Sequence, residues 1–99
     1  MKAYKLIRKM KDGTFSPLFI NKKSRMNKDI WYDAESHETK GFMLRKGFHC
    51  TTKPIAPHLS EKDRVWILVE VDNYETYKRP ESQGGIWILA QKMRIIREL

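Results

Sequence analysis

Residues 40–71, KGFMLRKGFHCTTKPIAPHLSEKDRVWILVEV, decide how this chain folds. Their last eight, residues 64–71, are rich in valine, isoleucine and leucine and are apolar at both odd and even positions. β-Branched and aromatic residues favour strands, and a strand that is apolar on both faces has to be covered on both. The sequence therefore predicts a central strand here, with Glu70 either paired or near its solvated end.

The middle of this stretch predicts a second strand and a short helix. Residues 48–52 combine an aromatic residue, a cysteine and two threonines, as a compact strand does. Thr52 followed by Pro54 is typical of a helix start, because the threonine hydroxyl can accept an unpaired N–H and proline fits the first turn. Pro57 would stop such a helix, so residues 54–59 are expected to form one or two turns.

On the N-terminal side, we expect a basic hairpin over residues 3–20 and a basic loop over residues 21–29. Apolar residues alternate roughly with lysine and arginine before Asp12 and Gly13. Asp-Gly between two strand-like runs favours a type I′ hairpin turn. Pro17 lacks a backbone N–H, so the return strand should lie at an edge or contain a bulge.

The remaining residues, 30–99, are expected to form the core of the sheet. Residues 72–80 are polar and predict a connection with one helical turn, and further strands follow at 86–91 and 93–99. About six short strands with one or two short helices give a single small α+β domain over residues 1–99. Its sheet is expected to be antiparallel or mixed and curled on itself.

The net charge of +8 lies entirely in the first 28 residues, which hold nine basic residues and one acidic residue, whereas the rest holds eleven of each. A concentrated positive field attracts polyanions, so a host nucleic acid or an acidic host protein is the expected partner. The alternative is a lysine-rich surface that binds nothing. The cations expected to contact a polyanion or partner are Lys5, Lys9, Lys11, Lys22, Lys23, Arg25 and Lys28.

Composition also limits the compartment and the chemistry. A single cysteine cannot form an internal disulfide, and no apolar run approaches the roughly 20 residues of a membrane span, so a soluble cytoplasmic protein is expected. His49, Cys50 and His58 lack the spacing of a zinc site, so no metal and no cofactor are expected. Trp31, Trp66 and Trp87 are expected in the core, and an exposed one would indicate an interface.

The glycine-rich stretch RPESQGG, residues 79–85, is a second candidate site. It offers a cation, a carboxylate, an amide and unshielded backbone N–H groups, which suit a small anion or a nucleotide. The alternative is a turn whose polar groups bond to one another. If this loop and residues 47–58 are both functional, they should meet in one cleft.

The run GFHCTT, residues 47–52, followed by the strand at 64–71, resembles the middle of ADP-ribosyltransferase-like domains. The resemblance implies NAD binding by Arg8 or Tyr4 and a nicotinamide pocket supported by Thr51 and Thr52. It places Gln83 where the family has its catalytic glutamate, which implies a degenerate active site. The full set of nucleotide-binding candidates is Arg8, His49, Thr51, Thr52, His58, Arg79, Glu81 and Gln83.

The whole chain resembles a family of small phage- or prophage-encoded proteins, through Tyr4-Lys5-Leu6, the segment 47–60 and the segment 79–87. The resemblance implies a phage protein that binds host machinery or inhibits a defence system, and it supplies no mechanism. The leading hypothesis is therefore a non-enzymatic binding protein. The alternative is a nucleotide-binding domain, and a homodimer is compatible with both.

Overall fold

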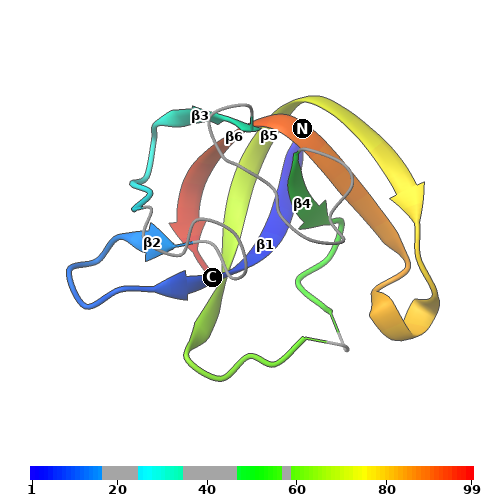
Figure 1. Ribbon diagram of the computed structural model, residues 1–99, viewed down its shortest axis with the longest axis horizontal. Coiled ribbons are helices and arrows are strands. Elements are labelled where there is room, and N and C mark those ends of the chain that lie inside the picture. Colours follow the sequence, from blue (N-terminus) through cyan, green and yellow to red (C-terminus); the bar gives the residue numbers. More distant parts are fainter. Residues whose placement is uncertain (17–24, 35–46, 57–58) are drawn as a thin grey trace.

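The structure is a computed structural model that describes residues 1–16, 25–34, 47–56 and 59–99. Six strands carry this part of the chain, and every pairing between them is antiparallel (Figure 1). A single 3-10 turn, η2 (Glu81–Gln83), connects the last two strands. The strands are β1 (Lys2–Lys9), β2 (Phe15–Ser16), β3 (Trp31–Asp33), β4 (Phe48–Thr51), β5 (Arg64–Lys78) and β6 (Ile86–Glu98).

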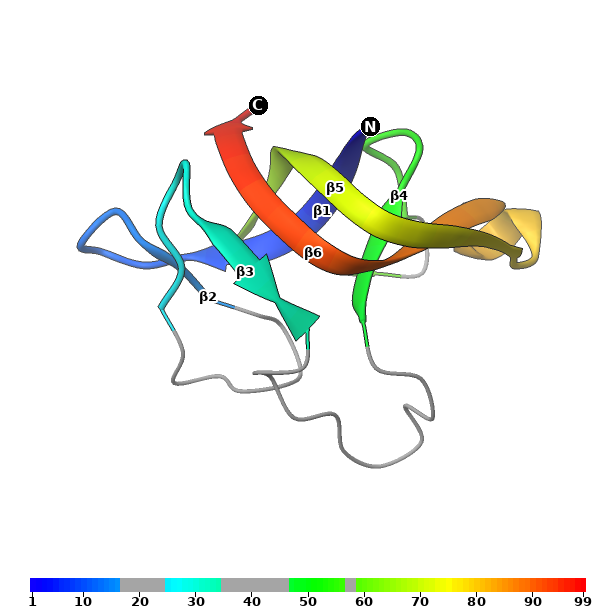
Figure 2. The same cartoon turned by 90° about the horizontal axis from the view of Figure 1, so that it is seen from above.

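Four of the strands form a closed ring. β1 pairs with both β4 and β5, and β6 also pairs with both β4 and β5. β2 extends the sheet beyond β1, and β3 extends it beyond β6 (Figure 2). The sheet is therefore curled on itself, and its concave face is closed around side chains from all four ring strands.

The interior of this ring is the hydrophobic core. The ring strands contribute fully buried aliphatic side chains, whose removal from water is the main force that holds the strands together. Met26 completes the core from outside the ring, and its backbone exchanges two hydrogen bonds with Phe15 of β2. Core residues from the ring are Ala3, Ile7, Phe48, Cys50, Ile67, Val69, Val71, Ile88, Ala90, Met93 and Ile95.

The long hairpin of β5 and β6 has a bend within it. The core-facing positions of β6 change from even-numbered to odd-numbered residues, from Ile88 and Ala90 to Met93 and Ile95. Asn73 of β5 lies opposite this change and has a φ of 49°, a left-handed conformation that asparagine tolerates better than most residues. Beyond it, the distal half of the hairpin runs past β1 and pairs with β4 (Figure 1).

The predicted α+β class is wrong, because the described residues form an almost all-β fold. Residues 52–56 bend without forming a helix, although Thr52 and Pro54 suggested a helix start. Residues 72–78 continue β5 instead of forming a polar connection. Their side chains are mostly exposed on both faces, so they show no alternation, and only pairing with β6 makes this segment a strand.

The expected turn between β1 and β2 is present but is of a different type. Gly13 N–H donates to Met10 O at 3.0 Å and Met10 N–H donates to Thr14 O at 2.8 Å. Only Gly13 has a positive φ in this turn, 87°, whereas a type I′ turn needs positive φ at both central residues. The chain therefore uses a three-residue loop with glycine in the left-handed position.

None of the described segments forms a helix of the length and apolarity needed to cross a lipid bilayer.

Candidate functional site

Two arginines lie directly opposite each other near the end of β1, which pairs with β2 on one side and with β5 on the other. Arg8 of β1 is the register partner of Arg64 of β5 and of Ser16 of β2. Its Nη2 donates to Ser16 Oγ at 3.3 Å, and Arg64 Nη1 donates to Ser60 O at 3.0 Å. We call these four residues the arginine end. Two like charges on opposed positions are unfavourable in a sheet, so this pair concentrates positive potential at one end of the molecule.

Three acidic side chains near the arginine end also contact groups other than the two arginines. Glu98 pairs with Lys9 Nζ at 2.8 Å, on the opposite face of β1 from Arg8. Glu61 accepts a hydrogen bond from the Trp66 indole at 2.7 Å. Asp12 accepts from the Thr14 hydroxyl at 2.6 Å, and this bond is the main reason that the pKa of Asp12 is lowered.

The predicted polyanion-binding cations are not one surface. Lys5 is directed toward the core side of β1 and donates to His49 O at 3.0 Å, and burial lowers its pKa. Lys9 is held in its ion pair with Glu98. Lys22 and Lys23 lie outside the described residues. The exposed members of the set are Lys9, Lys11, Arg25 and Lys28.

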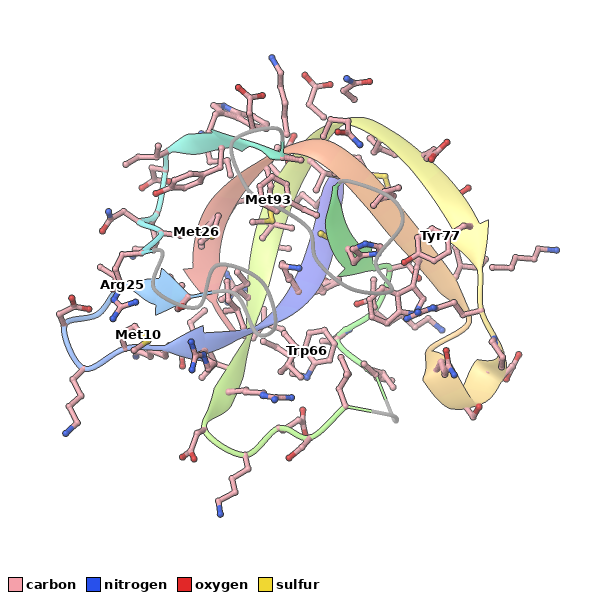
Figure 3. All side chains as sticks on the ribbon, in the orientation of Figure 1. Met10, Arg25, Met26, Trp66, Tyr77 and Met93 are labelled. Atoms are coloured by element: carbon pink, nitrogen blue, oxygen red, sulfur yellow. The ribbon has the colours of Figure 1, made fainter. Side chains whose placement is uncertain are left out.

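The two segments expected to meet in a cleft do lie side by side. Thr51 of β4 is the register partner of Trp87, and His49 Nδ1 lies 2.7 Å from the Tyr77 hydroxyl. Figure 3 labels Tyr77 on the distal half of the hairpin. The Arg79 guanidinium lies over the Trp87 ring at 5.0 Å and over the Tyr77 ring at 6.0 Å. This arrangement places three of the predicted nucleotide-binding residues, His49, Thr51 and Arg79, near one end of the hairpin.

The loop after Arg79 bonds mainly to itself. The N–H groups of Gln83 and Gly85 donate to Pro80 O, and that of Gly84 donates to Glu81 O. The carbonyl of Gln83 accepts from the Trp87 indole at 2.6 Å. Since all three backbone N–H groups already have acceptors, the loop does not form an anion-binding nest. Glu81 is exposed at its start.

The other nucleotide-binding candidates are dispersed. Thr51 is 2% exposed, and its hydroxyl donates to Lys53 O, whereas Thr52 is exposed. Tyr4 is the β1 partner of Thr51, and Arg8 lies four residues further along that strand, roughly 13 Å away. His58 lies outside the described residues. Arg8 and Thr51 are therefore not brought together.

No group of three or more histidine, cysteine, aspartate or glutamate side chains that could hold a metal occurs in the described part of the chain. His49 and Cys50 point to opposite faces of β4, since His49 contacts Tyr77 and Cys50 is buried in the core. Burial raises the pKa of the Cys50 thiol to about 11, and the nearby Lys5 offsets part of this rise. The thiol is therefore protonated at neutral pH and is a poor nucleophile.

Sequence reasoning missed one surface, on the outer side of β3. Trp31 was expected in the core, but it is 46% exposed. The Arg94 guanidinium lies over its ring at 5.5 Å. An open hollow of about 450 Å³ lies next to it, lined by Trp31, Tyr32, Asp33, Asp72 and Lys92. The signal in the sequence was the aspartate two residues after Trp31, which shares its face of the strand.

No protein-family model matches this chain, and it has no match among the curated proteins or the solved structures. The resemblances to phage-encoded proteins and to ADP-ribosyltransferase-like domains therefore stay hypotheses.

Proposed function

We propose that this protein is a non-enzymatic binding protein that holds a nucleic acid through its arginine end. The observation that carries the proposal is the direct opposition of Arg8 and Arg64. Guanidinium groups bind phosphate oxygens in a fixed fork geometry, and two of them on neighbouring strands can contact adjacent phosphates. A bound phosphate also removes the repulsion between the two arginines.

The charge of the whole chain supports the same partner. The net charge of +8 speeds encounter with a polyanion from any direction, and the arginine end then supplies the fixed contacts. Ser16 and Ser60 orient the two guanidinium groups. On the phage resemblance, the nucleic acid belongs to the host or to a host defence complex, and binding it serves an anti-defence role.

The test is binding of a labelled single-stranded oligonucleotide and of a duplex as a function of salt concentration. Each phosphate contact contributes about 0.7 to the slope of log K against log salt for a single strand and about 0.9 for a duplex. Arg8→Gln and Arg64→Gln should each lower the slope by about one contact and weaken all sequences alike. Arg79→Gln, at the other end of the molecule, is the matched control and should change neither affinity nor slope.

Absence of salt-dependent binding, or equal slopes for Arg64→Gln and the wild type, contradicts the proposal. An acidic protein captured by the wild type and lost in Arg64→Gln would assign the arginine end to a protein partner instead.

A second candidate is a nucleotide-binding domain of the ADP-ribosyltransferase-like kind. It is favoured by the meeting of His49 and Thr51 with Arg79 and the loop that contains Glu81 and Gln83. NAD should then raise the melting temperature, and Arg79→Gln should abolish that rise.

A further inference from the structure

The outer surface of β3, β6 and β5 carries side chains in two rows that follow the pairing of the strands. In one row Trp31 of β3 lies beside Arg94 of β6. In the other, Lys92 of β6 lies between Asp33 of β3 and Asp72 of β5. We call these five residues the β3 face.

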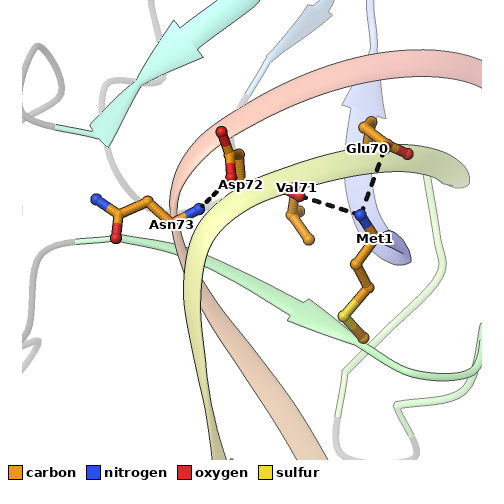
Figure 4. Close-up of polar contacts among 5 residues, drawn as sticks. All are labelled: Met1, Glu70, Val71, Asp72 and Asn73. Carbon is orange, nitrogen blue, oxygen red and sulfur yellow. Dashed lines mark hydrogen bonds and ion pairs between the residues drawn. The ribbon is translucent and has the colours of Figure 1, made fainter.

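The charges of the β3 face balance, unlike those of the whole molecule. It carries two cations and two carboxylates, whereas the chain has a net charge of +8. Glu70 of β5 is the register partner of Arg94 of β6. Its carboxylate forms an ion pair with the Met1 ammonium at 3.3 Å (Figure 4). This neutral composition does not suit a phosphate backbone, because Asp33 and Asp72 would repel it.

The two cations of the β3 face have polar atoms without hydrogen-bond or ion-pair partners among the described residues. Lys92 makes no hydrogen bond or ion pair with any described residue, even though Asp72 is its register neighbour. Asp72 Oδ1 accepts a hydrogen bond from the backbone N–H of the next residue, Asn73, at 2.9 Å (Figure 4). Arg94 Nε is buried and has no hydrogen-bond partner within the described residues. A buried donor without an acceptor is costly, so Arg94 is held in this row at some cost in stability.

Trp31 adds an anchor of the kind found at interface centres. It is 46% exposed beside the hollow, and its indole N–H makes no hydrogen bond with the described part of the chain. Tryptophan and arginine are the residues most enriched among interface hot spots.

We propose that the β3 face binds a second copy of this chain to form a two-fold symmetric dimer. Two molecules that each carry +8 repel one another, so self-association requires a locally neutral face, and the β3 face is one. In an isologous interface each contact occurs twice, so Lys92 of one copy pairs with Asp72 of the other and the reverse. Trp31 of each copy enters the hollow of its partner. The arginine ends stay outside this interface, and the inference does not depend on nucleic-acid binding.

The experiment measures molar mass by sedimentation equilibrium over a range of protein concentration. Lys92→Asp places two like-charged pairs across the two-fold axis, and so does Asp72→Lys. Each variant alone should weaken the dimer about tenfold or more. Mixed together, the two variants have opposite charges at both pairs, and the heterodimer should regain wild-type affinity.

Lys53→Asp, an exposed charge change on the segment after β4, is the matched control and should leave the dimer intact. A wild-type protein that stays monomeric at every concentration overturns the proposal. Failure of the mixed variants to associate also overturns it, provided that their circular dichroism spectra match the wild type. A misfolded Lys92→Asp variant leaves the concentration dependence of the wild type as a decisive measurement.

Discussion

Two tryptophans of this protein each lie under an arginine side chain, but they differ in the exposure of the ring and in the hydrogen bonding of the indole N–H. Trp87 is 5% exposed, and its indole N–H donates to Gln83 O at 2.6 Å under Arg79. Trp31 is 46% exposed under Arg94, and its indole makes no hydrogen bond to a described residue. The distances from guanidinium to ring, 5.0 and 5.5 Å, are almost the same.

The difference shows that a cation–π contact by itself does not identify a functional residue. Such a contact contributes about 0.5–1 kcal/mol at an exposed site, too little to decide the role of either tryptophan. The burial of the ring and the fate of its N–H decide it. The Trp87 indole N–H is satisfied within the fold and its buried ring stabilises the hairpin, whereas Trp31 has an exposed ring and an indole N–H that no described residue accepts.

Replacing each tryptophan by alanine should give the largest difference between the two sites, and the difference is in the free energy of unfolding. Trp87→Ala should lower the free energy of unfolding by about 3–5 kcal/mol, because it leaves a cavity in a buried site. Trp31→Ala should lower it by less than about 1 kcal/mol, as exposed substitutions do. Urea unfolding of both variants measures the two values, and similar losses would remove the distinction between the stacks.

Trp31→Ala is also the variant that should weaken self-association, although it is nearly neutral for stability. A Trp31→Ala protein that dimerises as the wild type does would show that the exposed ring is not an anchor.

Alkaline pH should expose a second difference, of intermediate size, on the Trp87 side of the molecule. Cys50 pairs with Ile88, next to Trp87, and burial raises the pKa of its thiol from 9.0 to about 11. The folded protein therefore holds this proton more tightly than the unfolded chain does. The resulting stability is complete below pH 9 and is lost as the pH rises toward 11.

The expected loss from Cys50 is about 2–3 kcal/mol by the free-energy equivalent of its pKa shift. The lowered pKa of Lys5 acts in the opposite sense, because the unfolded chain binds that proton more tightly. Comparing wild type with Cys50→Ala keeps Lys5 in both proteins. Urea unfolding at neutral and alkaline pH should show the wild type losing stability relative to Cys50→Ala, and a constant difference between them would contradict the assignment.

The sequence predicted the parts of the fold that depend on local apolar pattern. Residues 64–71 are a strand, as expected, but only one face is fully buried, through Ile67, Val69 and Val71, and the face of Trp66, Leu68 and Glu70 is partly exposed. Residues 72–78 gave no such pattern, since both of their faces are mostly exposed and their strand conformation depends on the distant β6. The expected helix does not form over the described residues 52–56, because a cap and a proline mark a helix start only when an apolar helical stripe follows.

The candidate surfaces were predictable to a smaller extent. The meeting of residues 47–51 with the loop after Arg79 was expected, but the sequence could not show that this loop's N–H groups bond internally. The sequence also could not show that Lys5 lies on the core side of the ring and donates to His49 O, so it was predicted as a partner-binding cation. Trp31 looked like a core residue because hydrophobicity does not reveal that a strand lies at the end of a sheet.

The smallest expected effects come from arginine-to-lysine substitutions, which test the comparison most directly because they change only the shape of the cation. Arg79→Lys and Arg94→Lys both keep the positive charge but replace the flat guanidinium, which stacks on an indole better than an ammonium does. Arg79→Lys should lower the free energy of unfolding by about 0.5 kcal/mol and leave the dimer unchanged. Arg94→Lys should leave unfolding unchanged and weaken the dimer about two- to fivefold, since it alters a group at the interface. Each variant is the control for the other. If Arg94→Lys changed unfolding and not association, the Trp31 stack would be a structural contact like that of Trp87, and the β3 face would lose its assigned role.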